Sequence, residues 1–202
     1  MEESLLIARV QRGDREAFAQ LVERYQTPVY NLAYRMLNNA NDAEDAAQET
    51  FLRAYAQAKT FRVDHAPRFA TWLLSICAHH CIDRLRRRKF LWLSLEDDAL
   101  EEALASDAPE PDDCVLRAED AREIAQSLER LAPAYRLVVV LKYWHDQSIE
   151  EIARTTGDSV NAVKVKLHRA RKMLARAMTA DQRQQTAAVS GQRSAVSQGA
   201  SL

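Results

Sequence analysis

The sequence predicts an all-α protein with two small helical domains joined by an acidic flexible linker, the second domain being a helix-turn-helix. Apolar residues recur at spacings of three and four along most of the chain, as on the buried face of an amphipathic helix. An acidic, alanine-rich stretch with two prolines, residues 95–114, interrupts this pattern and is too polar to bury much surface. After it, two helical patterns meet at Gly157, which is typical of a helix-turn-helix.

From these patterns we place a first helical domain at residues 1–92, the linker at 93–115 and the helix-turn-helix domain at 116–178. Residues 179–202 are mostly Gln, Ser, Ala and Thr, without a periodic apolar face. A segment of this composition is expected to be a disordered tail.

The net charge of the 202-residue chain is −1, but the charges are strongly segregated. Acidic residues dominate positions 96–123, whereas basic residues gather at 84–89 and 164–176. This asymmetry indicates local patches for nucleic acid. The three cysteines show no disulfide pattern, and we find neither a signal peptide nor an apolar run long enough to span a membrane. A cytoplasmic protein is therefore expected.

Five helices are expected before the linker. The first covers residues 2–11 and stops at Gly13, and Asp14 caps the second. Pro28 fits the first turn of a third helix, where its missing N–H costs nothing.

The fourth helix, residues 41–58, has an acidic first half. Asn41 is the expected N-cap, and Glu44 would complete a capping box. The fifth helix, residues 69–89, is instead basic and aromatic at its exposed positions. We expect two different partners for these two helices.

The helix over residues 69–89 carries an apolar side and an adjoining polar side. The apolar side holds Phe69, Leu73, Ile76, Cys77 and His80. The adjoining side holds Thr71, Trp72, Ser75, His79, Asp83 and Arg86. Cations that hold phosphates and aromatic rings that stack on bases are what binding of unpaired nucleic acid requires. The alternative is a core tryptophan beside a solvated basic helix end.

The second domain begins with a helix expected over residues 118–131. Pro133 fits the first turn of the next helix, whose Val138–Val139–Val140 run alone could also form a strand. Ser148 opens a capping box, Gly157 ends that helix, and Ser159 caps the last one.

The last helix has a core face and an opposite polar face. Predicted core residues are Val160, Val163, Leu167, Ala170 and Leu174. The opposite face carries Asn161, Val165, His168, Arg169 and Lys172, with Lys164 at its edge. Such side chains can contact base edges in the major groove, while flanking cations hold phosphates. Lys166 and Arg171 lie nearer the core side, so backbone contacts or pairing within the domain fit them better. The alternative for the whole helix is a solvated basic surface.

Taken together, these segments resemble the extracytoplasmic-function group of bacterial sigma factors. The resemblance covers residues 5–89 and 118–178 and is carried by DAEDAAQETFLRAY at 42–55, ATWLLSICAHHCIDRLRRRK at 70–89 and SIEEIARTTGDSVNAVKVKLHRARKML at 148–174. It implies a factor that directs core RNA polymerase to promoters in a response to stress or an environmental signal, with an anti-sigma factor as a further expected partner.

The resemblance also implies roles for particular residues. The positions that match polymerase clamp contacts are Asp45, Gln48 and Glu49. Those that match minus-ten strand contacts are Arg62, Asp64, Trp72, His79, Asp83 and Arg86. The minus-thirty-five positions are Asn161, Lys164, Val165, Lys166, His168, Arg169, Arg171 and Lys172. The loop departs from the family pattern, because Val63 stands where a Gly is common and Pro67 is added nearby.

Two alternatives remain open at this stage. A helix-turn-helix regulator that never contacts polymerase would explain residues 148–176 but not the acidic helix. A metal site or redox sensor could be built from Cys77, His79, His80 and Cys81, since thiolates and imidazoles are zinc ligands. The core position of Cys77 argues against the second, and no pattern of catalytic residues is present. We therefore expect no enzyme activity, metal or cofactor.

Overall fold

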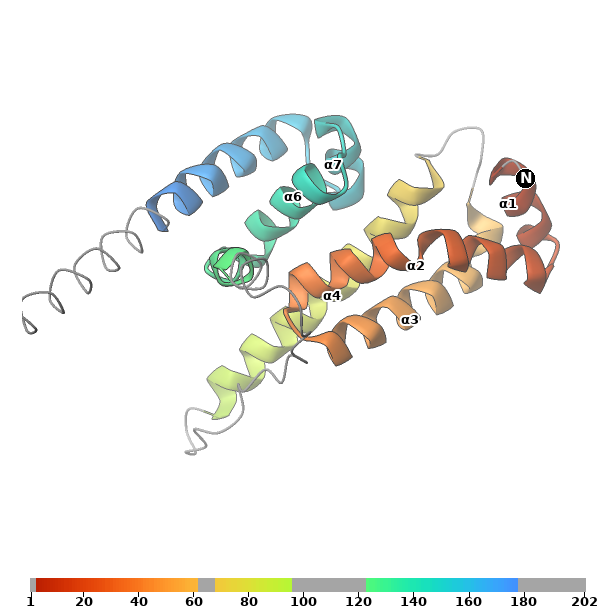
Figure 1. Ribbon diagram of the computed structural model, residues 1–202, viewed down its shortest axis with the longest axis horizontal. Helices are drawn as coiled ribbons and strands as arrows, with labels where there is room; N and C mark the ends of the chain where they lie inside the picture. Colours follow the sequence, from red (N-terminus) through yellow and green to blue (C-terminus); the bar gives the residue numbers. More distant parts are fainter. Residues whose placement is uncertain (1–2, 62–67, 96–122, 178–202) are drawn as a thin grey trace, which may run out of the picture.

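The computed structural model describes residues 3–61, 68–95 and 123–177, and in these ranges every regular element is a helix (Figure 1). This confirms the all-α class. The named helices are α1 (Glu3–Gln11), α2 (Arg15–Leu37), α3 (Ala40–Gln57), the 3-10 turn η1 (Ala58–Thr60), α4 (Phe69–Leu95), α6 (Pro133–Trp144) and α7 (Ile149–Thr156). Residues 123–129 and 160–177 are also helical. We call α1–α4 the first lobe and residues 123–177 the second lobe.

A tight turn reverses the chain between α1 and α2. Gly13 has a φ of 93°, which glycine adopts without steric cost. Asp14 is the N-cap of α2, as predicted, because its side chain accepts a hydrogen bond from the Ala17 N–H at 3.1 Å. Its carboxylate also pairs with Arg9 at 2.7 Å. The turn and cap pack the apolar face of α1 against α2.

Pro28 lies inside α2 rather than at the start of a separate helix, so that prediction was wrong. The buried face continues in phase across the proline, from Leu21 to Val29 and Leu32. An interior proline costs roughly 3 kcal/mol, but burial of a single large apolar side chain is worth about 1.5–3 kcal/mol. The apolar face therefore keeps the helix continuous.

The N-cap of α3 is Asn39 and not Asn41, which corrects the predicted capping box. The Asn39 side chain accepts from the Asp42 N–H at 2.9 Å. Asn38, just before it, has a left-handed φ of 49° and closes α2 by donating its N–H to the Tyr34 carbonyl at 2.7 Å. Three asparagines in the run Asn38–Asn39–Ala40–Asn41 compete for the cap, and the short α2–α3 turn selects the middle one.

The long helix α4 packs against both α2 and α3 and completes the first-lobe core. It ends at Leu95, beyond the expected residue 89. Thr71, expected on the exposed side, is buried instead. Opposite its start, the Gln11 side chain donates to the carbonyls of Ala58 and Phe61, which fixes α1 to the end of η1.

In the second lobe, α6 is a helix from Pro133, as predicted, and its valine run is fully inside the core. Ser148 and Glu151 form the predicted capping box at the start of α7. Gly157, with a φ of 73°, ends that helix as predicted. The buried Gln147 accepts a hydrogen bond from Thr155 at 3.0 Å, which closes the loop before α7.

The two lobes pack against each other, with α6 beside α2 and α7 beside α4 (Figure 1). The sequence patterns did not predict this contact. None of the helices in the described ranges is both long and apolar enough to cross a lipid bilayer. Of the predicted linker and tail, residues 96–115 and 179–202 lie outside the described ranges.

Candidate polymerase and nucleic-acid interfaces

The outward face of α3 combines carboxylates with apolar side chains. Asp45 and Gln48 are exposed, and Glu49 is half-buried and paired with Arg53 at 2.6 Å. Leu52, which sequence reasoning did not select, is 67% exposed on the same face. Positions 45, 48 and 52 fall one helical turn apart, and that spacing was the signal that could have identified Leu52. A helix face of this kind suits a partner that is both basic and apolar.

A groove of about 420 Å³ runs between α2 and α3 beside this face. Gln48 lines it together with Tyr30, Glu44 and Phe51. Because most of its lining is apolar, the groove extends the apolar part of the surface beyond the predicted polar contacts.

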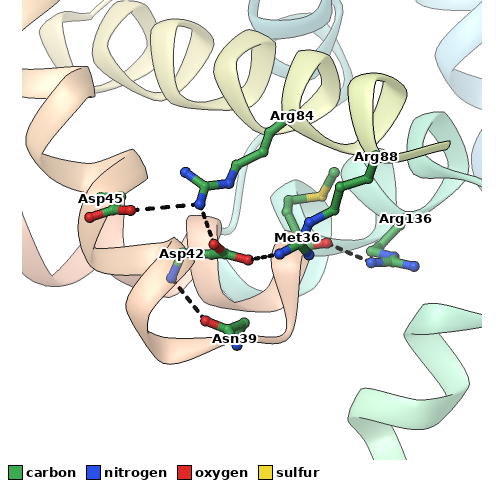
Figure 2. Close-up of polar contacts among 7 residues, drawn as sticks. All are labelled: Met36, Asn39, Asp42, Asp45, Arg84, Arg88 and Arg136. Carbon is green, nitrogen blue, oxygen red and sulfur yellow. Dashed lines mark hydrogen bonds and ion pairs between the residues drawn. The ribbon is translucent and has the colours of Figure 1, made fainter. Parts of the chain in front are cut away.

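Asp42 anchors the far end of α4 to the start of α3, as Figure 2 shows. Its side chain is only 11% exposed, and its two oxygens accept from Arg84 and Arg88. Arg84 also lies 3.6 Å from Asp45. A carboxylate in the first turn of a helix is additionally favoured by the helix dipole. Sequence reasoning missed this residue because its partners are more than 40 positions away.

Three of the predicted minus-ten residues lie exposed on α4. His79 approaches the Ser75 carbonyl through Nδ1 at 2.6 Å, so Nδ1 carries the proton and neutral His79 presents Nε2 as an acceptor. Asp83 and Arg86 lie one turn further on, 3.8 Å apart, and both are largely exposed. This face offers an acceptor, a carboxylate and a cation in succession.

Trp72 is half-buried in an aromatic cluster with Phe61 and Phe69 at centroid distances of 4.9 and 5.5 Å. Its ring is therefore part of the first-lobe packing as well as close to the polar face of α4. Arg62 and Asp64, the other predicted minus-ten residues, lie outside the described ranges.

Two members of the cysteine and histidine cluster on α4 lie inside the first-lobe core. Cys77 and Cys81 are both buried, and the Cys77 thiol faces the Val29 carbonyl at 3.7 Å. The Cys77 contact and burial together raise the pKa of Cys81, which disfavours the thiolate that binds zinc. Burial also lowers the pKa of half-buried His80. In the described part of the chain, no three His, Cys, Asp or Glu side chains come together as a metal site would require.

The helix over residues 160–177 follows α7 after a short turn. Ser159 accepts from the Ala162 N–H at 3.2 Å, which confirms it as the N-cap. Val163, Leu167 and Ala170 are buried as predicted. Val160 is 37% exposed, so its predicted core position was wrong. It occupies the first helical residue, before the helix reaches the core.

The opposite face of this helix is exposed along its length. The exposed side chains are Asn161, Lys164, Val165, His168, Arg169 and Lys172. Val165 is an apolar side chain that is 42% exposed amid cations. A basic row with one apolar contact is the composition that can read base edges and hold phosphates.

Lys166 and Arg171 have partners inside the second lobe. Lys166 pairs with Asp158 at 2.6 Å. Partial burial raises the pKa of the Asp158 carboxyl group, but the hydrogen bonds with Lys166 and Thr156 outweigh it, so the pKa is lowered overall. Arg171 donates to the Tyr143 hydroxyl at 2.7 Å. Both contacts agree with the predicted pairing within the domain and brace the helix against α6 and the turn before it.

These two lobes match two family models in chain order. Residues 21–90 match Sigma-70 region 2, and residues 121–174 match Sigma-70, region 4. These two matches define a sigma factor of the sigma-70 class, assembled from these two regions.

Full-length relatives define the group. The chain is 37% identical over 174 residues to the ECF RNA polymerase sigma factor SigW of Bacillus subtilis (strain 168), covering 83% of this chain and 92% of that one. It is 36% identical over 172 residues to the ECF RNA polymerase sigma factor SigM of Mycobacterium tuberculosis (strain ATCC 25618 / H37Rv), covering 85% and 82%. The protein belongs to the extracytoplasmic-function (ECF) group of RNA polymerase sigma factors.

Solved structures share the fold. CnrH, solved in complex with the cytosolic domain of CnrY, is 27% identical and superimposes with a TM-score of 0.64 over 88% of this chain and 97% of its own. The sigma factor RpoE of Bartonella quintana, solved with the anti-sigma factor NepR, gives a TM-score of 0.65 at 21% identity over 81% and 98%. The latter likeness concerns the fold alone.

Proposed function

We propose that this ECF sigma factor binds core RNA polymerase through α3, holds the melted minus-ten strand on α4, and reads the minus-thirty-five duplex with the helix over residues 160–177. The observation that carries this division of labour is the presence of three chemically distinct faces on one chain. One is acidic and apolar, one mixes an acceptor with cations, and one is a basic recognition helix.

The polymerase contact is assigned to Asp45, Gln48 and Glu49. Leu52 and the groove beside Gln48 supply the apolar area that these polar groups lack. Surface charge pairs alone are worth about 0–1 kcal/mol, so a stable contact requires the apolar area as well.

The minus-ten strand is assigned to His79, Asp83, Arg86 and the edge of Trp72, with Arg62 and Asp64 as further members of this site. His79 offers an acceptor to a base amino group, and Arg86 offers a cation to a phosphate. The aromatic cluster behind them keeps Trp72 in place beside the strand.

The minus-thirty-five duplex is assigned to the exposed face of the last helix. Lys164, Val165, His168 and Arg169 lie in its first three turns, where a recognition helix reaches base edges. Asn161 and Lys172 lie at the two ends of this row and suit a base edge or a phosphate. Lys166 and Arg171 support the helix through their partners within the lobe and contact phosphates from its sides.

The domain limits 1–92, 93–115, 116–178 and 179–202 are part of this proposal. The place of action is the cytoplasm, where the chromosome lies, and the response is to stress or another environmental signal. An anti-sigma factor is a further proposed partner, supported by the 27%-identical CnrH, which was solved in complex with the cytosolic domain of CnrY. The chain itself needs no catalytic group, because polymerase performs the chemistry.

Run-off transcription tests this function. Core polymerase and the full chain are incubated with pooled genomic fragments, and start sites are mapped. Discrete start sites that appear only with the chain present are expected. Tight, specific duplex binding by the chain alone, without any polymerase-dependent start site, would instead identify an ordinary helix-turn-helix regulator.

A further inference from the structure

The short helix α1 is tied to the η1 turn by the side chain of its last residue. Gln11 Nε2 donates to two carbonyl oxygens of this turn, to Ala58 at 3.1 Å and to Phe61 at 2.6 Å. Ala58 also accepts the Phe61 N–H at 3.2 Å, so the beginning and the end of the turn meet at one amide group. Phe61 is buried, and a buried carbonyl group requires a donor. Gln11 therefore determines where the backbone of Phe61 lies.

Phe61 in turn packs against the ring of Trp72. The centre of its ring lies 4.9 Å from that of Trp72 and 5.6 Å from that of Phe69, and it meets Phe69 edge to face at 86°. Phe69 completes the aromatic cluster at 5.5 Å from Trp72. At these separations and tilts, aromatic rings attract one another beyond the gain from burial. A shift of the Phe61 backbone is therefore passed on to Trp72.

A second contact from α1 reaches the same cluster through Tyr25. The Tyr25 ring lies 5.5 Å from the Phe69 ring, and its hydroxyl donates to the Glu3 carboxylate in the first turn of α1. Burial and then Glu3 raise the pKa of Tyr25, so the hydroxyl keeps its proton and remains a donor. From Glu3 to Gln11 the helix extends roughly 12 Å, which is close to the length of the row Tyr25–Phe69–Phe61, with its steps of 5.5 and 5.6 Å. The two ends of α1 thus hold the two ends of this row.

We propose, on the basis of the function above, that α1 is a positioning helix for the minus-ten strand and that Gln11, acting through Phe61, sets the orientation of the Trp72 ring. Trp72 is half-buried, whereas Phe61 and Phe69 are buried, and it is the member of the cluster that is assigned to the strand. Side-chain freedom that is lost on binding weakens binding. A ring that its neighbours already hold in place therefore stacks on a base more tightly. Gln11 needs no contact with DNA to have this effect.

Fluorescence of Trp72 in the full chain tests whether Gln11 orients the ring. Trp92→Phe and Trp144→Phe leave Trp72 as the single tryptophan. In this background, Gln11→Met keeps the length of the side chain but removes its donor. The fast local component of the Trp72 anisotropy decay should then grow, and the emission maximum should move to longer wavelength. Gln11→Lys, which retains an N–H donor, should behave like the parent chain.

Control variants show whether the effect is specific. Gln20→Met is the matched control, because Gln20 is exposed on α2 and the same substitution there should leave the decay unchanged. Tyr25→Phe keeps the ring but removes the hydroxyl, and it should enlarge the fast component to a smaller extent. If Trp72 in a folded Gln11→Met chain moves no more than in the parent, the proposal is overturned. If circular dichroism shows that Gln11→Met does not fold, the milder Tyr25→Phe decides, and an unchanged decay then overturns the role of α1.

Binding of single-stranded DNA by the polymerase complex tests the positioning role. The complex is titrated with a fluorescein-labelled non-template strand from a start site mapped by run-off transcription, and in parallel with a duplex that carries only the minus-thirty-five element. Loss of one whole base–ring stack corresponds to roughly 5- to 150-fold in affinity. Gln11→Met disturbs this stack and should weaken single-strand binding by roughly three- to tenfold, with unchanged duplex binding and with recovery in Gln11→Lys. Equal weakening of both probes would show a merely structural role and overturn the proposal.

Trp72→Ala separates this proposal from the proposed function. If Trp72→Ala weakens single-strand binding but a folded Gln11→Met chain does not, the positioning role is overturned and the minus-ten assignment stands. If Trp72→Ala binds the strand as tightly as wild type, the assignment of Trp72 in the proposed function fails. The anisotropy decay then decides by itself whether Gln11 orients the ring, and it does so equally if no start site is mapped.

Discussion

Replacing Asp42 with asparagine should destabilise the first lobe while leaving its shape unchanged. The wild-type carboxylate is 11% exposed and accepts from two guanidinium groups that are 31% and 46% exposed. A hydrogen bond to a charged group is worth about 1.5–3 kcal/mol, but the two arginines regain water once the charge is removed. We therefore expect a loss of about 2 kcal/mol in the free energy of unfolding, below the sum of two full bonds.

The assay is urea denaturation of the full chain followed by far-ultraviolet circular dichroism. Asp45→Asn is the matched control, because it removes the same charge from the same helix. Asp45 is 66% exposed, and its ion pair among the described residues is the one with Arg84 at 3.6 Å, so its loss should cost less than about 1 kcal/mol. Equal losses for the two variants would refute the reasoning that burial makes Asp42 the anchor.

Three further outcomes are expected. Arg169→Ala should reduce promoter-specific run-off by about 1–3 kcal/mol equivalent if it reads a base; a uniform loss over all templates would instead make it a phosphate contact. Asp45→Lys should weaken capture of core polymerase on an affinity column with unchanged circular dichroism, and unchanged capture would remove Asp45 from that interface. Burial and then Arg35 lower the pKa of His145 to about 4, with Asp146 opposing them. The pKa of a histidine in the unfolded chain is about 6.5, so the contribution of neutral His145 to the free energy of unfolding should be fully present above that pH. It should fall by up to roughly 3 kcal/mol as the pH drops towards 4. In acid denaturation, His145→Gln should flatten this pH dependence, and an unchanged profile would exclude His145 as its cause.

The sequence correctly predicted helix caps and turns that depend on neighbouring residues alone. The Asp14 cap, the Ser148 capping box and the Gly157 turn each depend on residues within a few positions, and all three predictions were confirmed. The Pro28 prediction failed because tertiary burial along α2 outweighs the intrinsic preference of proline. The Asn41 cap failed because neighbouring asparagines are equally good caps in isolation.

Hydrogen-bond and ion-pair partners far apart in the chain could not be predicted from the periodicity of apolar residues. Arg136 stands in an otherwise apolar run, and nothing nearby indicates that its partner is the Met36 carbonyl, 100 positions away. In the sequence, nothing distinguishes Asp42 from the other acidic residues of its helix, because its partner Arg84 lies on α4. The exposed residues of the last helix were predicted well, since one buried face determines the other side of a single helix.

Chemical labelling of the two buried thiols of α4, Cys77 and Cys81, can report how often the first lobe opens. The ionised sulfur is the nucleophile that attacks alkylating reagents, and Cys81 is held in its neutral form inside the core. Modification of Cys77 or Cys81 must therefore wait until α4 moves away from α2. The rate at which a maleimide or iodoacetamide labels these two sites reports how often that lobe opens, with no engineered probe.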